Sequence, residues 1–202
     1  MVGRAAALTI RALLLAVLAA SPATTSAQEM QVRAACRGGL PHGAYELREA
    51  GGQLRVAGAF NRGKRTGSFI FWTTDGTRVA HIPFDDDRQS GTLSLWYAKP
   101  SKGGDSRSKL QAEYAAGKRN GISRSWHPNG RARTEFVYAN DALVEARAWH
   151  LDGKALTDRA ARALATRDSV EDEKYYASLF TLVASHLPSC AGTPPAATGT
   201  AS

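Results

Sequence analysis

The chain has 202 residues, of which 26 are basic and 18 acidic, giving a formal net charge of +8. The basic residues are spread along the chain without a dense cluster, which is typical of a solvated surface, and the export predicted below makes nucleic acid the least expected anionic partner. Weak contact with an anionic membrane surface stays open as an alternative, because a positive net charge favours it.

The first 27 residues have the pattern of a secretory signal peptide. Arg4 and Arg11 supply positive charge, Ala12–Ala20 is a short apolar core, and small residues lead to a predicted cleavage after Ala27. The apolar run is far shorter than the roughly 20 residues that a membrane-spanning helix needs. Without residues 1–27 the chain keeps 24 basic residues (26 − 2) and 18 acidic ones, a net charge of +6. We therefore expect an exported protein, either periplasmic or secreted.

Cys36 and Cys190 are the only cysteines. In an exported protein an even pair is typical of a disulfide. Two free thiols or a reactive pair are the alternatives, but neither cysteine lies in a CxxC motif or near a predicted helix start that would lower its pKa. The sequence therefore predicts a structural disulfide between an N-terminal lead, residues 28–42, and the end of the ordered region.

Residues 43–156 contain an internal repeat. One glycine set recurs with gaps of 24, 24 and 30 residues, and two aromatic sets recur with gaps of 24, 30 and 24 or 23 residues. The aromatic sets are Phe60, Phe84, Tyr114 and Tyr138, and Trp72, Trp96, Trp126 and Trp149. The long gaps all span residues 100–108 (PSKGGDSRS), which we interpret as an insertion that lengthens one turn.

Each unit contains two short strand-like runs and two turns. A glycine opens a run that ends at tryptophan, and a turn with glycine at a fixed place follows. Dipeptides such as Asn129-Gly130 are typical of hairpin turns, since these turns need a positive φ. The four turn glycines are Gly52, Gly76, Gly130 and Gly153. The pattern predicts a mainly β fold: an antiparallel hairpin meander of about five repeats that forms an elongated sheet.

One or two C-terminal helices are expected over residues 157–190. A short helix is predicted from about Thr157 to Thr166, and a second is predicted to start at Asp168-Ser169 and to end at Pro188. Its apolar stripe would cover the sheet where the inward positions become small, at Ser123, Ser125, Ala146 and Ala148. The tail, residues 191–202, is small and proline-rich, and we expect it to be disordered.

The repeat unit GKRNGISRSWHPNGRARTEFVYANDAL resembles the variant MORN repeat. Gly117-Lys118, Gly121, Trp126-His127 and Asn129-Gly130 carry the likeness, and Asp152-Gly153-Lys154 repeats part of it. Proteins with such repeats are often labelled YwqK-type antitoxins. The resemblance covers about residues 43–156 and implies a β-hairpin scaffold used for binding. Asp85-Asp86-Asp87 and Asn140-Asp141 depart from the expected turn, as does the predicted export from a cytoplasmic antitoxin.

The sequence contains no recognisable catalytic motif, metal-ligand pattern or cofactor fingerprint, so we expect no catalytic residues, metal or cofactor. His127 and His150 follow tryptophans at equivalent repeat positions, and Tyr97 occupies the same place in an earlier copy. This interchange favours half-buried packing rings over metal ligands. The acidic run at Asp85–Asp87 is expected to be a solvated turn and the aromatic ladder to pack, although it could form a stacking face.

Together these features predict an exported, non-catalytic repeat protein that binds a protein or a cell-envelope component. An antitoxin that neutralises a toxin is the alternative implied by the family label, and membrane-surface binding is a second. The oligomeric state is not specified by the sequence. A specific site is expected where the copies differ: residues 100–108, Asp85–Asp87, or the small-residue face beneath the terminal helix.

Overall fold

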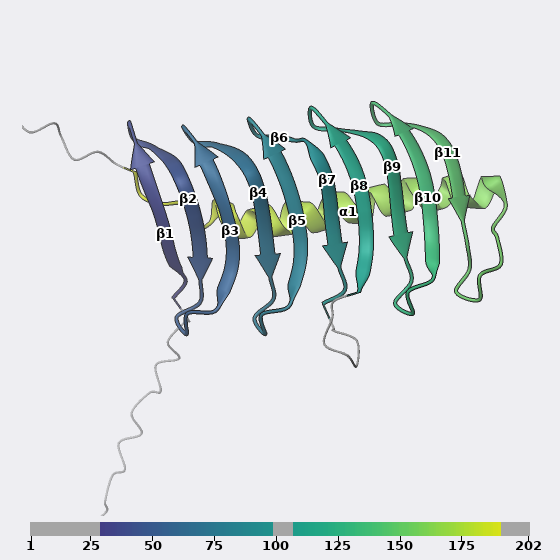
Figure 1. The fold of residues 1–202 in the computed structure, drawn as a ribbon, viewed down its shortest axis with the longest axis horizontal. Helices are drawn as coiled ribbons and strands as arrows, with labels where there is room; N and C mark the ends of the chain where they lie inside the picture. Colours follow the sequence, from purple (N-terminus) through teal and green to yellow (C-terminus); the bar gives the residue numbers. More distant parts are fainter. Residues whose placement is uncertain (1–28, 99–106, 191–202) are drawn as a thin grey trace, which may run out of the picture.

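A computed structural model describes residues 29–98 and 107–190. The predicted signal peptide, the tail, and insertion residues 100–106 lie outside the described residues. Eleven strands form one antiparallel sheet in the order β1-β2-β3-β4-β5-β7-β8-β9-β10-β11, with β6 paired to β5 (Figure 1). The strands are β1 (Gln31–Arg37), β2 (Leu40–Arg48), β3 (Leu54–Asn61), β4 (Lys64–Trp72), β5 (Arg78–Asp85), β6 (Arg88–Gln89), β7 (Gly91–Trp96), β8 (Ser108–Ala115), β9 (Lys118–Trp126), β10 (Ala132–Ala139) and β11 (Ala142–Ala148).

The fold confirms the predicted hairpin meander, because the strands along the sheet pair with their neighbours in sequence. The lead predicted for residues 28–42 is not separate from the array, since β1 is the first strand of the sheet and pairs with β2. The four predicted turn glycines all have positive φ, between 84° and 94°. At the insertion, the Tyr97 amide donates to the Arg107 carbonyl at 3.0 Å, so the ends of the lengthened turn still pair.

The turns at the opposite ends of the hairpins have two consecutive residues of positive φ, which is the geometry of a type I′ turn. Aspartate replaces glycine as the second of these residues at Asp87 and Asp141. Asp87 Oδ1 accepts a hydrogen bond from the Arg65 amide at 2.9 Å, and Asp141 Oδ1 accepts one from the Arg119 amide at 2.8 Å. The acidic turn is solvent-exposed as predicted, and it also ties each hairpin to the preceding one.

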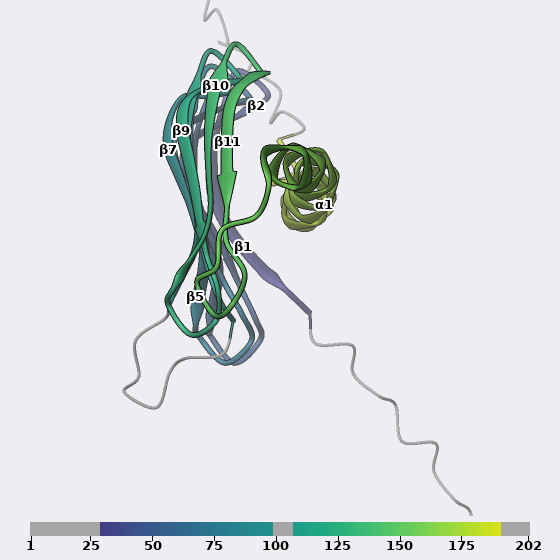
Figure 2. The same cartoon turned by 90° about the vertical axis from the view of Figure 1, so that its right-hand side faces the viewer.

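One face of the sheet is covered by a single helix, α1 (Asp158–Ala184), and the other face is covered by no described element (Figure 2). The helix starts beside β11 and runs back across the strands towards β1 (Figure 1). Strand alternation places the large buried side chains on the helix face, among them Leu47, Phe71 and Leu95. Within the described residues no helix is long and apolar enough to span a membrane.

The prediction of a helix cap at Asp168-Ser169 was wrong, because residues 158–184 form one continuous helix. Thr157 is the N-cap, and its hydroxyl accepts a hydrogen bond from the Ala160 amide at 3.3 Å. No glycine or proline interrupts the run, and the Ser169 hydroxyl donates to the Ala165 carbonyl one turn back instead of capping a new helix. Asp168 therefore lies in the middle of a helix, where its side chain is available for another role.

Two hydrophobic clusters hold the helix to the sheet. Near the C-terminal end of α1, Phe180 contacts the rings of Phe69, Phe71 and Phe84 at centroid distances of 5.2–6.0 Å. Near its start, small side chains of α1 pack closely on β10 and β11; the cluster contains Phe136, Tyr138, Ala146, Ala148, Ala161 and Ala165. The predicted contact between the helix and the small-residue face is therefore present.

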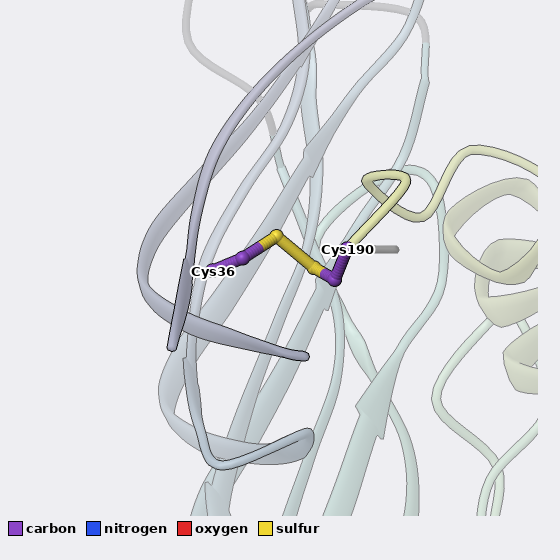
Figure 3. Close-up of a disulfide and its surroundings, with 2 residues drawn as sticks. All are labelled: Cys36 and Cys190. Atoms are coloured by element: carbon purple, nitrogen blue, oxygen red, sulfur yellow. A yellow bond between two sulfur atoms is a disulfide. The ribbon is translucent and has the colours of Figure 1, made fainter. Parts of the chain in front are cut away.

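The predicted disulfide between Cys36 and Cys190 is also present (Figure 3). It connects the edge strand β1 to the segment that follows α1, with a Cα–Cα distance of 5.6 Å. The Tyr45 hydroxyl donates to the His186 carbonyl at 3.1 Å in the same region. The C-terminal end of the helix is therefore fixed to the first hairpin both covalently and by packing.

Candidate functional site: a polar cavity between sheet and helix

A cavity of about 540 Å³ lies between the middle of α1 and strands β8, β9 and β10, in the gap between the two hydrophobic clusters. Its floor on the sheet contains Ala112, Ser123, Ser125 and Thr134. Charged and phenolic side chains from both the sheet and the helix line the rest. We call this space the helix–sheet cavity. Its volume falls within the range of about 300–1,000 Å³ that is typical of small-molecule sites.

The cavity exists because the inward side chains shrink along the sheet. Paired residues in one row across the helix face run from Leu47, Val56 and Phe71 at the N-terminal end to Ser125, Thr134 and Ala148 at the other. Small residues at the far end let α1 approach closely through its own alanines. In the middle, small sheet residues face large polar side chains of α1, and the space between them is not filled.

Two strand irregularities turn basic side chains into the cavity. In β10 the pairing with β9 skips Arg133, which lies between the paired residues Ala132 and Thr134. In β8 the pairing with β7 skips Lys109, which lies between the paired residues Ser108 and Leu110. A bulged residue no longer obeys the two-residue alternation of the strand, so its side chain can take a new direction. Lys109 and Arg133 both line the cavity.

The helix contributes carboxylates from positions that would otherwise be apolar. Ala161, Ala165, Asp168, Asp172 and Tyr176 follow one another at helical spacing, and the two alanines and Tyr176 are buried. Asp168 and Asp172 thus lie within the stripe that faces the sheet, and both line the cavity. Carboxylates are rarely placed in such a stripe unless they are paired or functional.

Asp168 is paired. Arg133 donates two hydrogen bonds to its carboxylate, from Nη1 at 2.6 Å and from Nη2 at 2.9 Å. The hydrogen bond to Asp168 is also the main cause of the raised pKa of Arg133. Arg119 reaches the helix as well, because its Nη1 donates to the Ser169 hydroxyl at 2.5 Å and its guanidinium stacks on the Tyr138 ring at 4.4 Å. These contacts span the cavity on its β10 and β9 sides.

Asp172 has no hydrogen bond or ion pair within the described part of the chain. Burial raises the pKa of its carboxyl to about 6, although Lys109, the next largest influence, lowers it. Burial also raises the pKa of Tyr114 to about 12 and that of Tyr176 still further. The cavity therefore offers a carboxyl that can accept or release a proton near neutral pH, next to a pair of phenols that stay protonated.

The two predicted aromatic sets occupy different environments. Phe60, Phe84 and Tyr138 are buried on the helix face, and the ring of Tyr114 lines the cavity. The tryptophans are only half-buried and lie at or just after the C-terminal ends of β4, β7, β9 and β11; they are Trp72, Trp96, Trp126 and Trp149. The structure thus brings Tyr114, Trp126 and Tyr138 to the cavity and leaves the other members of both sets outside it.

Tyr97 and His127 make equivalent contacts. The Tyr97 hydroxyl donates to the Trp126 carbonyl at 2.7 Å, and His127 Nε2 lies 3.0 Å from the Trp149 carbonyl one repeat later. This agrees with the interpretation of these rings as interchangeable packing elements. His150 lies in an exposed turn. Among residues 29–98 and 107–190, no group of three or more His, Cys, Asp or Glu side chains is arranged to hold a metal ion.

The small-residue face, named from the sequence as one of three places for a site, supplies the floor of the cavity through Ser123 and Ser125. The charged residues around that floor were missed; they are Lys109, Arg119, Arg133, Asp168 and Asp172. A signal for the last two is present in the sequence, because they interrupt the apolar stripe of α1 once the helix is extended back to Asp158. For Lys109 and Arg133 the signal is weaker, since a bulge cannot be located from alternation alone.

No protein-family model and no curated protein matches this chain.

Proposed function

We propose that this protein is an exported binding module that holds a small polar ligand in the helix–sheet cavity. The observation that carries the proposal is the buried stripe of α1, which places Asp168 and Asp172 over small hydroxyl residues instead of apolar ones. Leucine at these positions would fill the gap without desolvating charge. Polar groups that are kept at such a cost to stability are typical of binding sites.

The compartment supports the same proposal. A disulfide that joins the ends of the fold fits an oxidising environment, and a signal peptide is predicted from the sequence. The repeat array then acts as a rigid frame: its hairpins are tied to one another through their turns, and α1 is fixed at both ends. The small-residue floor and the lining charges are held in place before a ligand arrives, which lowers the entropy cost of binding.

The open face of the sheet leaves room for a macromolecular partner as well. The expected scaffold for a protein or cell-envelope component is compatible with a ligand beneath the helix, and the resemblance to variant MORN repeats stays a prediction. So do the antitoxin and membrane-surface alternatives.

The test is retention of a ligand by the intact, oxidised protein. We expect native mass spectrometry of protein incubated with envelope extract to show a bound small molecule, and Ser123→Leu, which fills the cavity floor, to abolish it. Ser94→Leu introduces the same side chain on the open face and is the matched control, with retention unchanged. Thermal unfolding would verify that both variants fold. An empty wild-type protein, or equal retention in Ser123→Leu, would contradict the proposal.

A further inference from the structure

The charges that line the helix–sheet cavity are not all paired. Arg133 is bound to Asp168, and Arg119 lies 3.6 Å from the Asp141 carboxylate and donates to Ser169. Lys109 Nζ lies over the ring of Tyr175 at 5.3 Å, and within the described residues it has no carboxylate partner. Asp172 likewise has none. Lys109 and Asp172 are therefore the half-buried cation and anion that line this space without an ion pair, whereas Glu171 and Glu173, which also line it, are exposed.

A ligand with only one charge would pair with either Lys109 or Asp172 and would leave the other without a counter-charge. An anion that bound Lys109 would lie in a cavity whose rim also contains Glu171 and Glu173, with Asp172 unpaired beside it. A cation that bound Asp172 would leave Lys109 unpaired. Partly buried charges are costly without a counter-charge, and a charged hydrogen bond contributes about 1.5–3 kcal/mol when it is made.

We propose that the ligand is a zwitterion of the amino-acid or short-peptide class, whose ammonium group binds Asp172 and whose carboxylate binds Lys109. The inference rests on the proposed function, because it names the ligand of the same cavity. The hydroxyls of Ser123, Ser125 and Thr134 and the phenol of Tyr114 supply neutral hydrogen-bonding groups around the backbone of such a ligand.

Binding should depend on pH in one direction. The charged and titratable groups that face Asp172 are Lys109, Arg119, Arg133, Tyr114 and Tyr138 from the sheet and Asp168 and Tyr176 from the helix. An ammonium group binds the ionised carboxylate, so a ligand competes with the proton whose pKa is about 6. The affinity should therefore fall by up to about tenfold for each pH unit below that value and level off above it.

The experiment is calorimetric titration of the oxidised protein at pH 7 with L-alanine, L-alanyl-L-alanine and L-alanyl-L-alanyl-L-alanine. Each compound is compared with its N-acetyl form, which lacks the ammonium group, and with its C-terminal amide, which lacks the carboxylate. We expect at least one free compound to bind and each of its blocked forms to bind about tenfold or more weakly.

Two variants separate the roles. Asp172→Asn should bring the free and N-acetyl compounds to within about twofold of each other and remove the pH dependence, because the variant can no longer pair with the ammonium group. Lys109→Gln should bring the affinities of the free compound and its C-terminal amide to within about twofold of each other, because the variant can no longer pair with the carboxylate. Asp158→Asn, at the exposed start of α1, and Lys118→Gln, on the exposed end of β9, are the matched controls and should keep both preferences.

The proposal is overturned if none of the free compounds binds, if blocked and free forms bind equally to the wild type, or if Asp172→Asn keeps the preference for the ammonium group. The proposed function can survive these results, because a different compound retained from envelope extract would still show a ligand in the cavity. Failure of both experiments would remove both ideas.

Discussion

Arg133 of β10 and Asp168 of α1 are joined by two hydrogen bonds of 2.6 and 2.9 Å that cross from the sheet to the helix. Neither residue is where a simple pattern would place it: the arginine is bulged out of the strand register, and the aspartate interrupts the inward stripe of the helix. The pair forms one wall of the helix–sheet cavity, so its strength bears on how firmly the helix is held there.

Breaking this pair should destabilise the fold more than removing it altogether. Arg133→Met or Asp168→Ala alone leaves a partly buried charge without its partner, and we expect each to lower the free energy of unfolding by about 2–3 kcal/mol. The double variant should lose less than either single variant, because it leaves no unpaired charge. Urea unfolding of the four proteins measures the coupling. The exposed pair Arg162–Asp158 on the same helix is the control, with an expected coupling below about 0.5 kcal/mol. Additive effects of Arg133→Met and Asp168→Ala would show that the ion pair does not contribute to the free energy of unfolding.

Asp172→Asn should stabilise the ligand-free protein at neutral pH. Because burial raises the pKa of this carboxyl from 3.8 to about 6, the folded state binds its proton more tightly than the unfolded state. Stability that comes from the protonated form is therefore lost as the pH rises from about 4 to about 6. Above pH 6 the variant should be more stable by up to about 3 kcal/mol, and at pH 4 the two should be equal.

Chemical unfolding at pH 4 and pH 7 measures this difference. Asp158→Asn, which changes an exposed carboxylate in the first turn of α1, is the matched control and should change stability by less than about 1 kcal/mol at pH 7. Equal stability of Asp172→Asn and the wild type at pH 7 would mean that the carboxyl is better solvated or better paired than the structure shows.

Gly58 in β3 lies directly beneath the ring of Phe69. A Cβ at this position would lie 2.6 Å from two atoms of that ring, and the ring is fully buried against its neighbours. Gly58→Ala should therefore displace Phe69 and lower the free energy of unfolding by about 1–3 kcal/mol. Gly51→Ala has open space around it and no positive φ, so it should be neutral or slightly stabilising. A neutral Gly58→Ala, measured in the same urea titration, would show that the core is more adaptable than its packing indicates.

Reducing the disulfide should weaken the fold mainly at the C-terminal end of α1. Cys36 and Cys190 are separated by 154 residues, and closing a loop of that length disfavours the unfolded chain by about 5 kcal/mol in the entropy model. We expect hydrogen exchange after reduction to accelerate first in the last turns of α1 and in β1. The Cys36→Ser/Cys190→Ser variant should behave like the reduced protein and be insensitive to reductant. Unchanged exchange in those segments would show that packing around Phe180 alone holds the end of the helix.

Much of the architecture could be predicted because it repeats. Strand ends, turn glycines and the position of the insertion all follow from residue spacing, since one hairpin geometry recurs and each copy supports the assignment of the others. The disulfide could be predicted from the cysteine count, and the helix from its apolar residues. The boundary between two predicted helices was wrong because Asp168 and Ser169 are typical capping residues, and local composition does not show that Thr157 already fills that role.

The charged lining of the cavity could not be predicted for a different reason. Lys109 and Arg133 would point to the open face in a regular strand, and only the bulge in the three-dimensional pairing brings them to α1. Asp168 and Asp172 can be recognised as cavity residues only when α1 is known to be continuous and to lie across β8–β10. Sequence periodicity specifies each element by itself, whereas the cavity depends on how two elements meet.

The single helix that crosses the whole array also limits how the array can change. Its 27 residues extend about 40 Å at 1.5 Å each, which closely matches the nine strand spacings, about 43 Å, between β1 and β11. One more hairpin would widen the sheet by about 10 Å and would require about six further helical residues for Cys190 still to reach Cys36. The length of α1 thus fixes the number of repeats. Duplication of one of the first repeats would need a simultaneous lengthening of α1, which lies more than 50 residues further along the sequence.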